Sequence, residues 1–218
     1  MIETEITRGG QSISIAVEGI IGAGKTRFCR YLRNATSCLV IDEAESPLLT
    51  KYHDDRERWG FSAQMDLLAQ RITALRSAHR LTKQDRSVIL DRSIVGDFAF
   101  ARANWRLGWL SAEEYRIYCD IYEELLIHVP APDVTLYLEV DPRIAIKRAE
   151  KRDGVAPPLM YMHELLRTHD EVINDARSRG VIVHRYKWDD IKQERYNTEA
   201  DFLITRLLRD VSSDWLGD

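Results

Sequence analysis

A glycine-rich segment near the N-terminus has the residue types and spacing of a phosphate-binding loop. Residues 19–26 read Gly-Ile-Ile-Gly-Ala-Gly-Lys-Thr and match GxxxxGK[ST] at every fixed position, which disfavours a glycine turn that binds nothing. Glycines let backbone N–H groups turn toward phosphates, and the helix expected next presents its positive end to the same anion. The predicted phosphate-binding residues are Gly19, Gly22, Ala23, Gly24, Lys25 and Thr26. Lys25 would reach the β and γ phosphates of a nucleoside triphosphate, and the Thr26 hydroxyl would bind Mg²⁺.

Two predicted strands end in charged residues. Asp42 and Glu43 follow Leu-Val-Ile, and Asp91 and Arg92 follow Val-Ile-Leu. In a parallel sheet these ends lie beside the phosphate loop, where ligands bind. A carboxylate there could accept the proton of an attacking hydroxyl or hold a metal, and an arginine could neutralise a transferring phosphoryl group. The alternative is that the acids cap the next helix, which we favour only for Asp42.

Three polar residues could recognise a flat polar ligand. Gln64 and Arg71 are seven residues apart in a predicted helix, two turns, and therefore share one face. An amide both donates and accepts hydrogen bonds, which suits the edge of a base. Asp97 is a plausible carboxylate partner for Arg71. From spacing alone, ordinary solvated helix charges are the more common explanation.

Arg148 and Arg152 are four residues apart and face the same way on a predicted helix, before a break at Asp153-Gly154. Two guanidinium groups in this position suit a lid that closes over ATP phosphates and excludes water. The alternative is a solvated basic face.

The elements that must position these residues alternate between strand and helix. Strands are predicted at 12–18, 38–42, 87–91, 134–140 and 181–186. Helices are predicted at 25–35, 58–82, within 94–127, at 142–152, 158–178 and 198–210. Short apolar strands separated by helices indicate an α/β fold with a parallel sheet covered on both faces. Because no linker or repeat divides the sequence, we expect a single domain over 1–218.

Composition narrows the functional classes. The net charge is −4 and no basic run is present, which argues against a nucleic-acid binder. The start of the chain has no apolar segment typical of a secretory signal, and no stretch is apolar enough for a membrane span. Cys29, Cys38 and Cys119 are odd in number and far apart, so we expect buried thiols and a cytoplasmic protein.

Taken in order, several segments resemble the deoxynucleoside kinase family over roughly residues 13–175. The segments that carry the resemblance are 18–26, 46–52, 58–64, 70–71, 91–97 and 147–152. The resemblance implies a P-loop kinase fold with a five-stranded parallel sheet and an arginine-bearing lid. It also implies ATP as phosphate donor, Mg²⁺ as cofactor and a homodimer.

The resemblance assigns catalytic roles to Glu43 and Arg92, and Lys25 of the phosphate loop completes the predicted catalytic set. Glu43 matches the general base that takes the proton of the 5′-hydroxyl, and Arg92 matches the arginine beside that oxygen. Asp91 stands where the family has an acid near the metal. Two departures are visible: Ala44 replaces a usual proline, and Asp91 is often glutamate in the family.

The resemblance also assigns a substrate pocket. Gln64 matches the glutamine that reads the base, and Arg71 with Asp97 matches a pair found in members that favour deoxyadenosine, deoxyguanosine or deoxycytidine over thymidine. Phe100 matches an aromatic residue packed on the base. Tyr52 is the match for the tyrosine on the sugar 3′-hydroxyl, but one extra residue separates it from Gln64, so His53 is a rival.

Two further features of the family pattern have little support in this sequence: the acid that reaches the sugar 3′-hydroxyl and the site of the donor adenine. The family's lid has a longer acidic segment that reaches the 3′-hydroxyl, whereas Asp153 is the one nearby acid in this chain. The donor adenine is expected near residues 187–190.

Two other functions share parts of this pattern. A nucleoside monophosphate kinase similar to thymidylate kinase would need additional cations for the acceptor phosphate, whereas Asp97 would neutralise one cation here. A regulatory P-loop switch would need no acceptor, and the guanine-binding pattern of GTPases is missing from the sequence. The sequence therefore favours a deoxynucleoside kinase over both.

Overall fold

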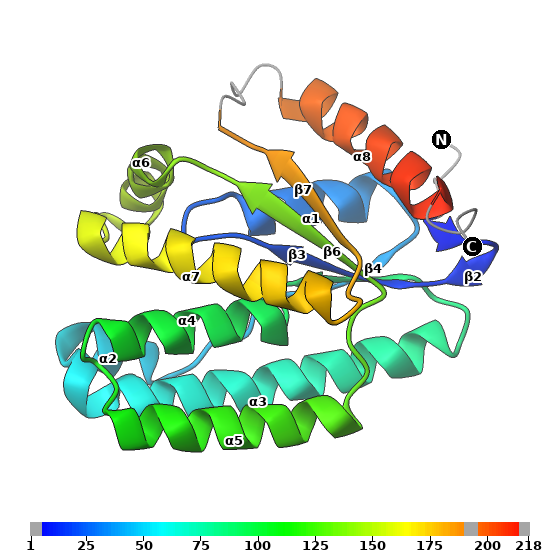
Figure 1. Ribbon diagram of the computed structural model, residues 1–218. Coiled ribbons are helices and arrows are strands. Elements are labelled where there is room, and N and C mark those ends of the chain that lie inside the picture. The colour runs from blue at the N-terminus through cyan, green and yellow to red at the C-terminus, as the bar shows by residue number, and fades with distance from the viewer. Residues whose placement is uncertain (1–5, 190–195, 214–218) are drawn as a thin grey trace.

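The computed structural model describes residues 6–189 and 196–213 and shows a five-stranded parallel sheet (Figure 1). The strands are β3 (Ser14–Glu18), β4 (Leu39–Ile41), β5 (Val88–Asp91), β6 (Val134–Glu139) and β7 (Val183–Lys187), in the order β4-β5-β3-β6-β7. All of its neighbours pair in parallel. The central strands β3 and β5 are buried at every residue, as expected of a sheet covered on both faces.

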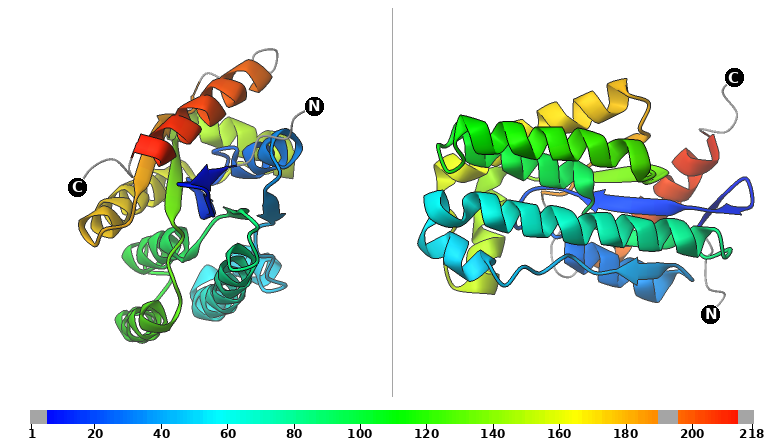
Figure 2. Two further views of the ribbon diagram at one scale, coloured as in Figure 1. Left: turned by 90° about the vertical axis from the view of Figure 1, so that its right-hand side faces the viewer. Right: turned by 90° about the horizontal axis from the view of Figure 1, so that it is seen from below.

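Helices cover the two faces unequally. Figure 1 shows α1 (Lys25–Ala35) and α8 (Tyr196–Ser213) on one face, and α3 (Arg56–Thr82), α4 (Ile94–Arg106) and α7 (Leu159–Ser178) on the other. On that second face, α5 (Ala112–His128) lies farthest from the sheet in the view along the strands (Figure 2). Two buried apolar clusters fill the space between these layers.

The charged residues predicted at strand ends lie at the carboxyl end of the sheet. Two short elements lie at this end, α2 (Leu49–Asp54) and α6 (Pro142–Asp153) (Figure 1). The hairpin of β1 (Thr7–Arg8) and β2 (Gln11–Ser12) lies at the opposite end. Because the sheet is parallel, the segments that follow all five strands lie together at one end of it.

The predicted strands and helices are all present, with bounds shifted by a few residues. The helix predicted at 25–35 has those bounds in the structure, and the one predicted at 58–82 begins two residues earlier. The hairpin at 7–12 and the helix at 49–54 were not predicted. Both are too short to show a helical or alternating apolar pattern.

None of the helices in the described ranges is long and apolar enough to cross a lipid bilayer.

Candidate active site

The loop at 19–26 has the geometry of an anion cradle. Gly19, Gly22 and Gly24 have φ angles of 152°, 75° and 98°, a region that favours glycine. A side chain at Gly22 is excluded on contact grounds as well, because its Cβ would lie 2.1 Å from the carbonyl oxygen of Ala145. Helix α1 begins after Gly24 with no side-chain cap, so its first N–H groups remain available to an anion.

Lys25 lies in this cradle, buried, with Nζ donating to the carbonyl of Ile20 at 3.3 Å. Burial and the nearby Arg92 lower the pKa of Lys25 to about 8, although Glu43 and Asp91 act in the opposite direction. The ammonium group is therefore charged at neutral pH, and none of the carboxylates in the described ranges is in hydrogen-bonding contact with it. An anion arriving in the loop would supply the missing partner.

Glu43 and Arg92 form an ion pair at the ends of β4 and β5. Arg92 Nε donates to Glu43 Oε1 at 2.8 Å, and Arg71 lies 3.7 Å from the same oxygen. Burial raises the pKa of Glu43, but Arg92, Lys25 and Arg71 together bring it down to about 2. The Glu43 side chain is 36% exposed, and a groove of about 710 Å³ beside α3 reaches both members of the pair. The carboxylate is thus ionised and accessible.

Arg92 is held from several directions. Its φ of 77° is unusual for a residue other than glycine and indicates a backbone that the surroundings fix in place. The guanidinium lies 4.5 Å above the Phe100 ring and donates to the carbonyl of Gly19 at 3.2 Å. NH1 lies 3.4 Å from His169 Nε2, whose ring also contacts Phe100 edge-on. These contacts therefore fix the guanidinium beside the phosphate loop.

Asp91 fits a place for a divalent cation. It is buried, and neither of its carboxylate oxygens has a hydrogen-bond partner among the described residues. Burial and Glu43 raise the pKa of Asp91, whereas Lys25 and the neighbouring Thr26 act to lower it. The Thr26 side chain is thus near, although its hydroxyl does not reach hydrogen-bonding geometry. Mg²⁺ is commonly held by one or two protein oxygens together with phosphates and water, and this pair suits that arrangement.

A buried polar network connects α3 to α4. Arg71 Nε donates to Asp97 Oδ1 at 2.8 Å, which is the pairing that the sequence predicted. Gln64 Nε2 donates to Asp97 Oδ2 at 2.9 Å, and Tyr118 donates to the same oxygen at 2.8 Å. Asn104 donates to Gln64 Oε1 at 3.4 Å. Because each of these side chains is at most 5% exposed, the network is preorganised and closed to bulk water.

Tyr52 reaches the same network from α2. Its hydroxyl donates to Asn104 Oδ1 at 2.8 Å and the residue is buried, whereas His53 is exposed. Tyr52 is therefore better placed than His53 to contact a ligand beside Gln64. The Phe100 ring faces Arg92 and His169, so its predicted contact with a base stays a prediction.

The two lid arginines differ in their contacts. Arg148 donates to the carbonyls of Ala23 at 3.4 Å, Trp188 at 3.0 Å and Asp189 at 2.7 Å. It joins α6 to the phosphate loop and to the segment after β7, whereas the sequence suggested a cation turned to phosphate. Arg152 is exposed and makes a two-pronged ion pair with the adjacent Asp153 at 2.6 and 2.8 Å. The segment predicted for the adenine is described only as far as Asp189, and residue 190 lies outside the described ranges.

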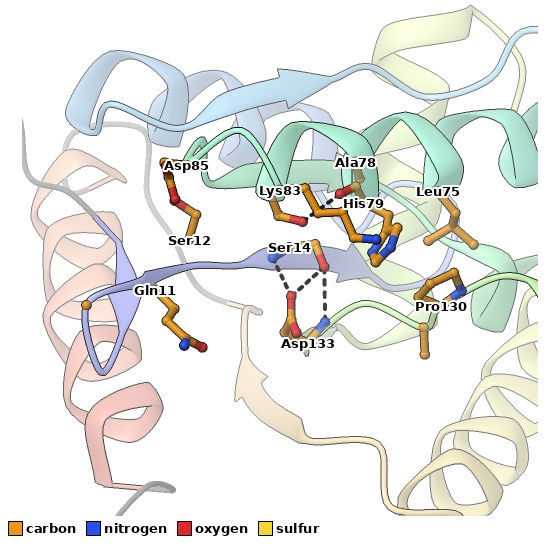
Figure 3. A pocket seen from close by; sticks show the side chains of 13 residues that line it. Gln11, Ser12, Ser14, Leu75, Ala78, His79, Lys83, Asp85, Pro130 and Asp133 are labelled. Carbon is orange, nitrogen blue, oxygen red and sulfur yellow. Dashed lines mark hydrogen bonds between the residues drawn. The ribbon is translucent and has the colours of Figure 1, made fainter.

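A separate polar cavity of about 450 Å³ lies at the opposite end of the sheet (Figure 3). Its wall includes His79, Lys83 and Asp85, and its floor includes Asp133, which accepts from Ser14 at 2.7 Å. The charges on its wall are of both signs. It also lies at the amino ends of the strands, away from the catalytic groups, so we place the active site at the other end.

Sequence reasoning gave no role to four buried polar residues of the site. They are Glu18, Asn104, Tyr118 and His169. Glu18 carries a sequence signal, since it is an acid at the end of a buried strand just before the loop. The other three are single polar residues in helices, where no spacing distinguishes them.

Comparison with known proteins gives a consistent result. A family model described as deoxynucleoside kinase matches residues 15–205. A Dictyostelium discoideum deoxyguanosine kinase is 32% identical over 80% of this chain, and a deoxyadenosine kinase of the same organism is 26% identical over 94%. The chain spans 64% of the first relative's length and 85% of the second's.

The solved structures that resemble this chain include a deoxyadenosine kinase from M. mycoides with bound dATP. It superposes with a TM-score of 0.75 at 22% identity, covering 89% of this chain and 99% of the other. At this level of identity the likeness establishes the P-loop kinase fold predicted from the sequence.

Proposed function

This chain belongs to the deoxynucleoside kinase family, and from that premise we propose that it transfers the γ-phosphoryl group of ATP to the 5′-hydroxyl of a deoxynucleoside. The observation that carries the proposal is the Glu43–Arg92 pair, accessible from the groove and adjacent to the buried Lys25. A proton acceptor and two cations close to the phosphate loop support this proposal.

In the proposed reaction the 5′-oxygen attacks the γ-phosphorus, and the bond to the β–γ bridging oxygen breaks to release ADP. Glu43 accepts the proton of the hydroxyl, and Arg92 stabilises the charge on the transferring group. Lys25 and the loop N–H groups hold the β and γ phosphates. Thr26 and Asp91 would hold Mg²⁺, which when bound neutralises charge on those phosphates.

The charge balance of the acceptor side favours a nucleoside over a nucleoside monophosphate. Arg71 is bound to Asp97 and Arg92 to Glu43, so these two cations already have carboxylate partners. A second phosphate would need cations that are not committed in this way. We therefore place a deoxynucleoside ahead of thymidylate. The resemblance of the Arg71–Asp97 pair to the family pattern implies that deoxyadenosine, deoxyguanosine and deoxycytidine are favoured over thymidine.

Several features of the wider protein are part of the same proposal. Gln64 and Phe100 would contact the base, Tyr52 the sugar, and Arg148 and Arg152 the donor. We also propose a single domain over 1–218, a cytoplasmic location and a homodimer. The exposed apolar residues on α4 and α5, Trp105, Ile117 and Ile121, support a homodimer because they are 36 to 39% exposed on adjacent helices.

The test is a substrate screen with Mg²⁺-ATP and each of the four deoxynucleosides, with dTMP as a fifth acceptor. Formation of ADP and of the 5′-monophosphate would be measured in parallel. We expect phosphorylation of at least one of the three favoured deoxynucleosides and slower turnover of thymidine. Turnover of dTMP alone would instead establish a monophosphate kinase, and ADP formation without any acceptor would refute both.

A further inference from the structure

Glu18 is a fully buried carboxylate that the proposed reaction does not use. It ends β3, one residue before the phosphate loop, and is 0% exposed. Oε1 accepts from the Ser93 N–H at 2.6 Å, the Ser93 hydroxyl at 2.8 Å and the Gly96 N–H at 3.1 Å. Oε2 accepts no hydrogen bond from the described residues and lies 3.7 Å from Arg92 NH1. Burying a carboxylate lowers stability unless hydrogen-bond donors and cations surround it, and Glu18 has both.

Glu18 and Glu43 contact the same guanidinium from different sides. Glu43 contacts Nε from the accessible side, and Glu18 lies beside NH1 on the buried side. In the proposed reaction Glu43 accepts a proton and loses its charge, so Arg92 loses its nearest anion at the moment when it must stabilise the phosphoryl group. Burial makes an uncompensated guanidinium unfavourable, so a second anion that cannot reach the substrate would keep Arg92 in place.

We propose that Glu18 is a positioning residue that holds Arg92 when Glu43 becomes protonated. This inference rests on the proposed phosphoryl transfer. Glu18 is sealed from the ligand and takes no proton from it, so it acts only through Arg92 and through the start of α4. That helix also carries Asp97, one residue beyond Gly96, and Glu18 thereby ties the donor loop to the acceptor network.

The space around Glu18 supports the assignment independently of charge. A Cβ added at Gly96 would lie 2.1 Å from Glu18 Oε2 and 2.9 Å from Oε1. Gly96 is inside a helix, where glycine lowers stability by about 1 kcal/mol relative to alanine. The fold therefore has a helix-weakening residue at a position where a side chain would displace this carboxylate.

His169 is the other group at NH1, and it is a neutral one. Its Nδ1 lies 2.8 Å from the carbonyl of Leu165, so Nδ1 carries the hydrogen and Nε2 faces Arg92 as an acceptor. The imidazole orients the guanidinium but supplies no negative charge. Among the described residues, Glu18 is thus the buried carboxylate within ion-pair distance of Arg92 NH1, and Asp91 acts on the guanidinium without such a pair.

The experiment measures thermal stability and steady-state kinetics for Glu18→Gln, Glu43→Gln and the double variant. We expect Glu18→Gln to lower kcat by roughly 10- to 100-fold, the usual effect of removing an outer-shell partner. Both KM values should stay within about 3-fold, because Glu18 does not touch either substrate. In the double variant the loss of Tm should exceed the sum of the single losses, since Arg92 then lacks both of the carboxylates that pair with it.

The matched control is Glu139→Gln, which removes another carboxylate from the end of a neighbouring strand. Glu139 pairs with Arg185 at 3.1 Å and has no contact with Arg92, so its effect on Tm should add to that of Glu43→Gln. Additive Tm losses for Glu18 and Glu43 would overturn the proposal. This stability readout does not depend on activity, and it would stand even if the substrate screen showed no kinase.

Glu18→Asp separates charge from packing and remains informative if the glutamine variant folds poorly. If the charge matters, the smaller aspartate should retain more activity than the isosteric glutamine. If Glu18 only fills space, the glutamine should be the milder change, and that order would also overturn the proposal.

Discussion

The acceptor side and the donor side of the site both lie at the carboxyl ends of the strands. They differ in whether their charged and polar groups already have partners within the protein. Between α3 and α4, Asp97 is 1% exposed and accepts hydrogen bonds from three protein donors. Around the phosphate loop, the cradle N–H groups lack a side-chain cap, and Lys25 has no carboxylate in hydrogen-bonding contact within the part of the chain that the structure describes. A neutral ligand of defined shape suits a network that is already satisfied. A polyanion suits donors that are still free.

The largest expected effect on stability comes from a substitution that disrupts the acceptor network. Asp97→Asn removes the charge that pairs with Arg71, a residue only 5% exposed. Arg71 then keeps only the longer contact with Glu43, and loss of its hydrogen-bonded carboxylate should reduce the free energy of unfolding by about 3 to 5 kcal/mol. Chemical denaturation would measure this change in the free energy of unfolding. The control Asp120→Asn breaks an exposed pair with Arg116 and should change stability by about 1 kcal/mol or less.

If Asp97→Asn were as mild as Asp120→Asn, the acceptor network would not be the rigid half of the site.

The donor side should respond in catalysis and hardly in stability. Lys25→Ala should lower kcat/KM by roughly 10² to 10³-fold, the usual effect of removing one preorganised group that stabilises developing charge. Its Tm should not fall, because burial of the ammonium group is itself unfavourable. Lys83→Ala, in the cavity at the opposite end of the sheet, is the control and should leave both quantities unchanged. A large fall in Tm for Lys25→Ala would contradict the contrast.

The pH dependence of donor binding sharpens the same point. Because the pKa of Lys25 is lowered to about 8, the free enzyme loses this charge as pH rises through that value. The dissociation constant for ATP should be constant below pH 8 and rise by up to about tenfold per unit above it. Calorimetric titrations from pH 6.5 to 9.5 would show the bend. Lys25→Ala should show no bend, and a bend that persists in that variant would assign the titration to another group.

The smallest expected effect concerns the lid. Arg152 and Asp153 form an exposed pair, so Arg152→Ala should change the free energy of unfolding by about 1 kcal/mol or less. If Arg152 turns to the donor phosphates, the KM for ATP should still rise by roughly tenfold, as for a charge-assisted hydrogen bond of about 1.5 kcal/mol. The KM for the deoxynucleoside should not change. An unchanged KM for ATP would show that the lid does not contact the donor through this residue.

The parts of the site that the sequence could predict are those set by local patterns. The phosphate loop is continuous in sequence, and helix α1 directly follows it as predicted. Spacing alone made Asp97 only a plausible partner of Arg71, and the resemblance to the family assigned the pair. The five strands of the parallel sheet could be predicted because each is a short apolar run bounded by polar residues.

The parts that the sequence could not predict depend on contacts between distant segments. Glu18 contacts Ser93 across 75 positions of the chain, and His169 lies beside Arg92 across 77. Arg148 likewise donates to backbone carbonyls 40 and 41 residues away, which no side-chain pattern can reveal. Helix α2 is only six residues long, so tertiary packing rather than periodicity defines it.

The most direct test of the central claim is a single-turnover measurement on Glu43→Gln with Mg²⁺-ATP and the deoxynucleoside that the screen identifies as best. Deoxynucleoside affinity, measured by calorimetry, should remain close to that of the unmodified protein. The rate of phosphoryl transfer should fall by roughly 10² to 10⁴-fold, the usual contribution of a general base. A near-normal transfer rate would contradict the account, because the carboxylate at the end of β4 would then not receive the proton of the 5′-hydroxyl.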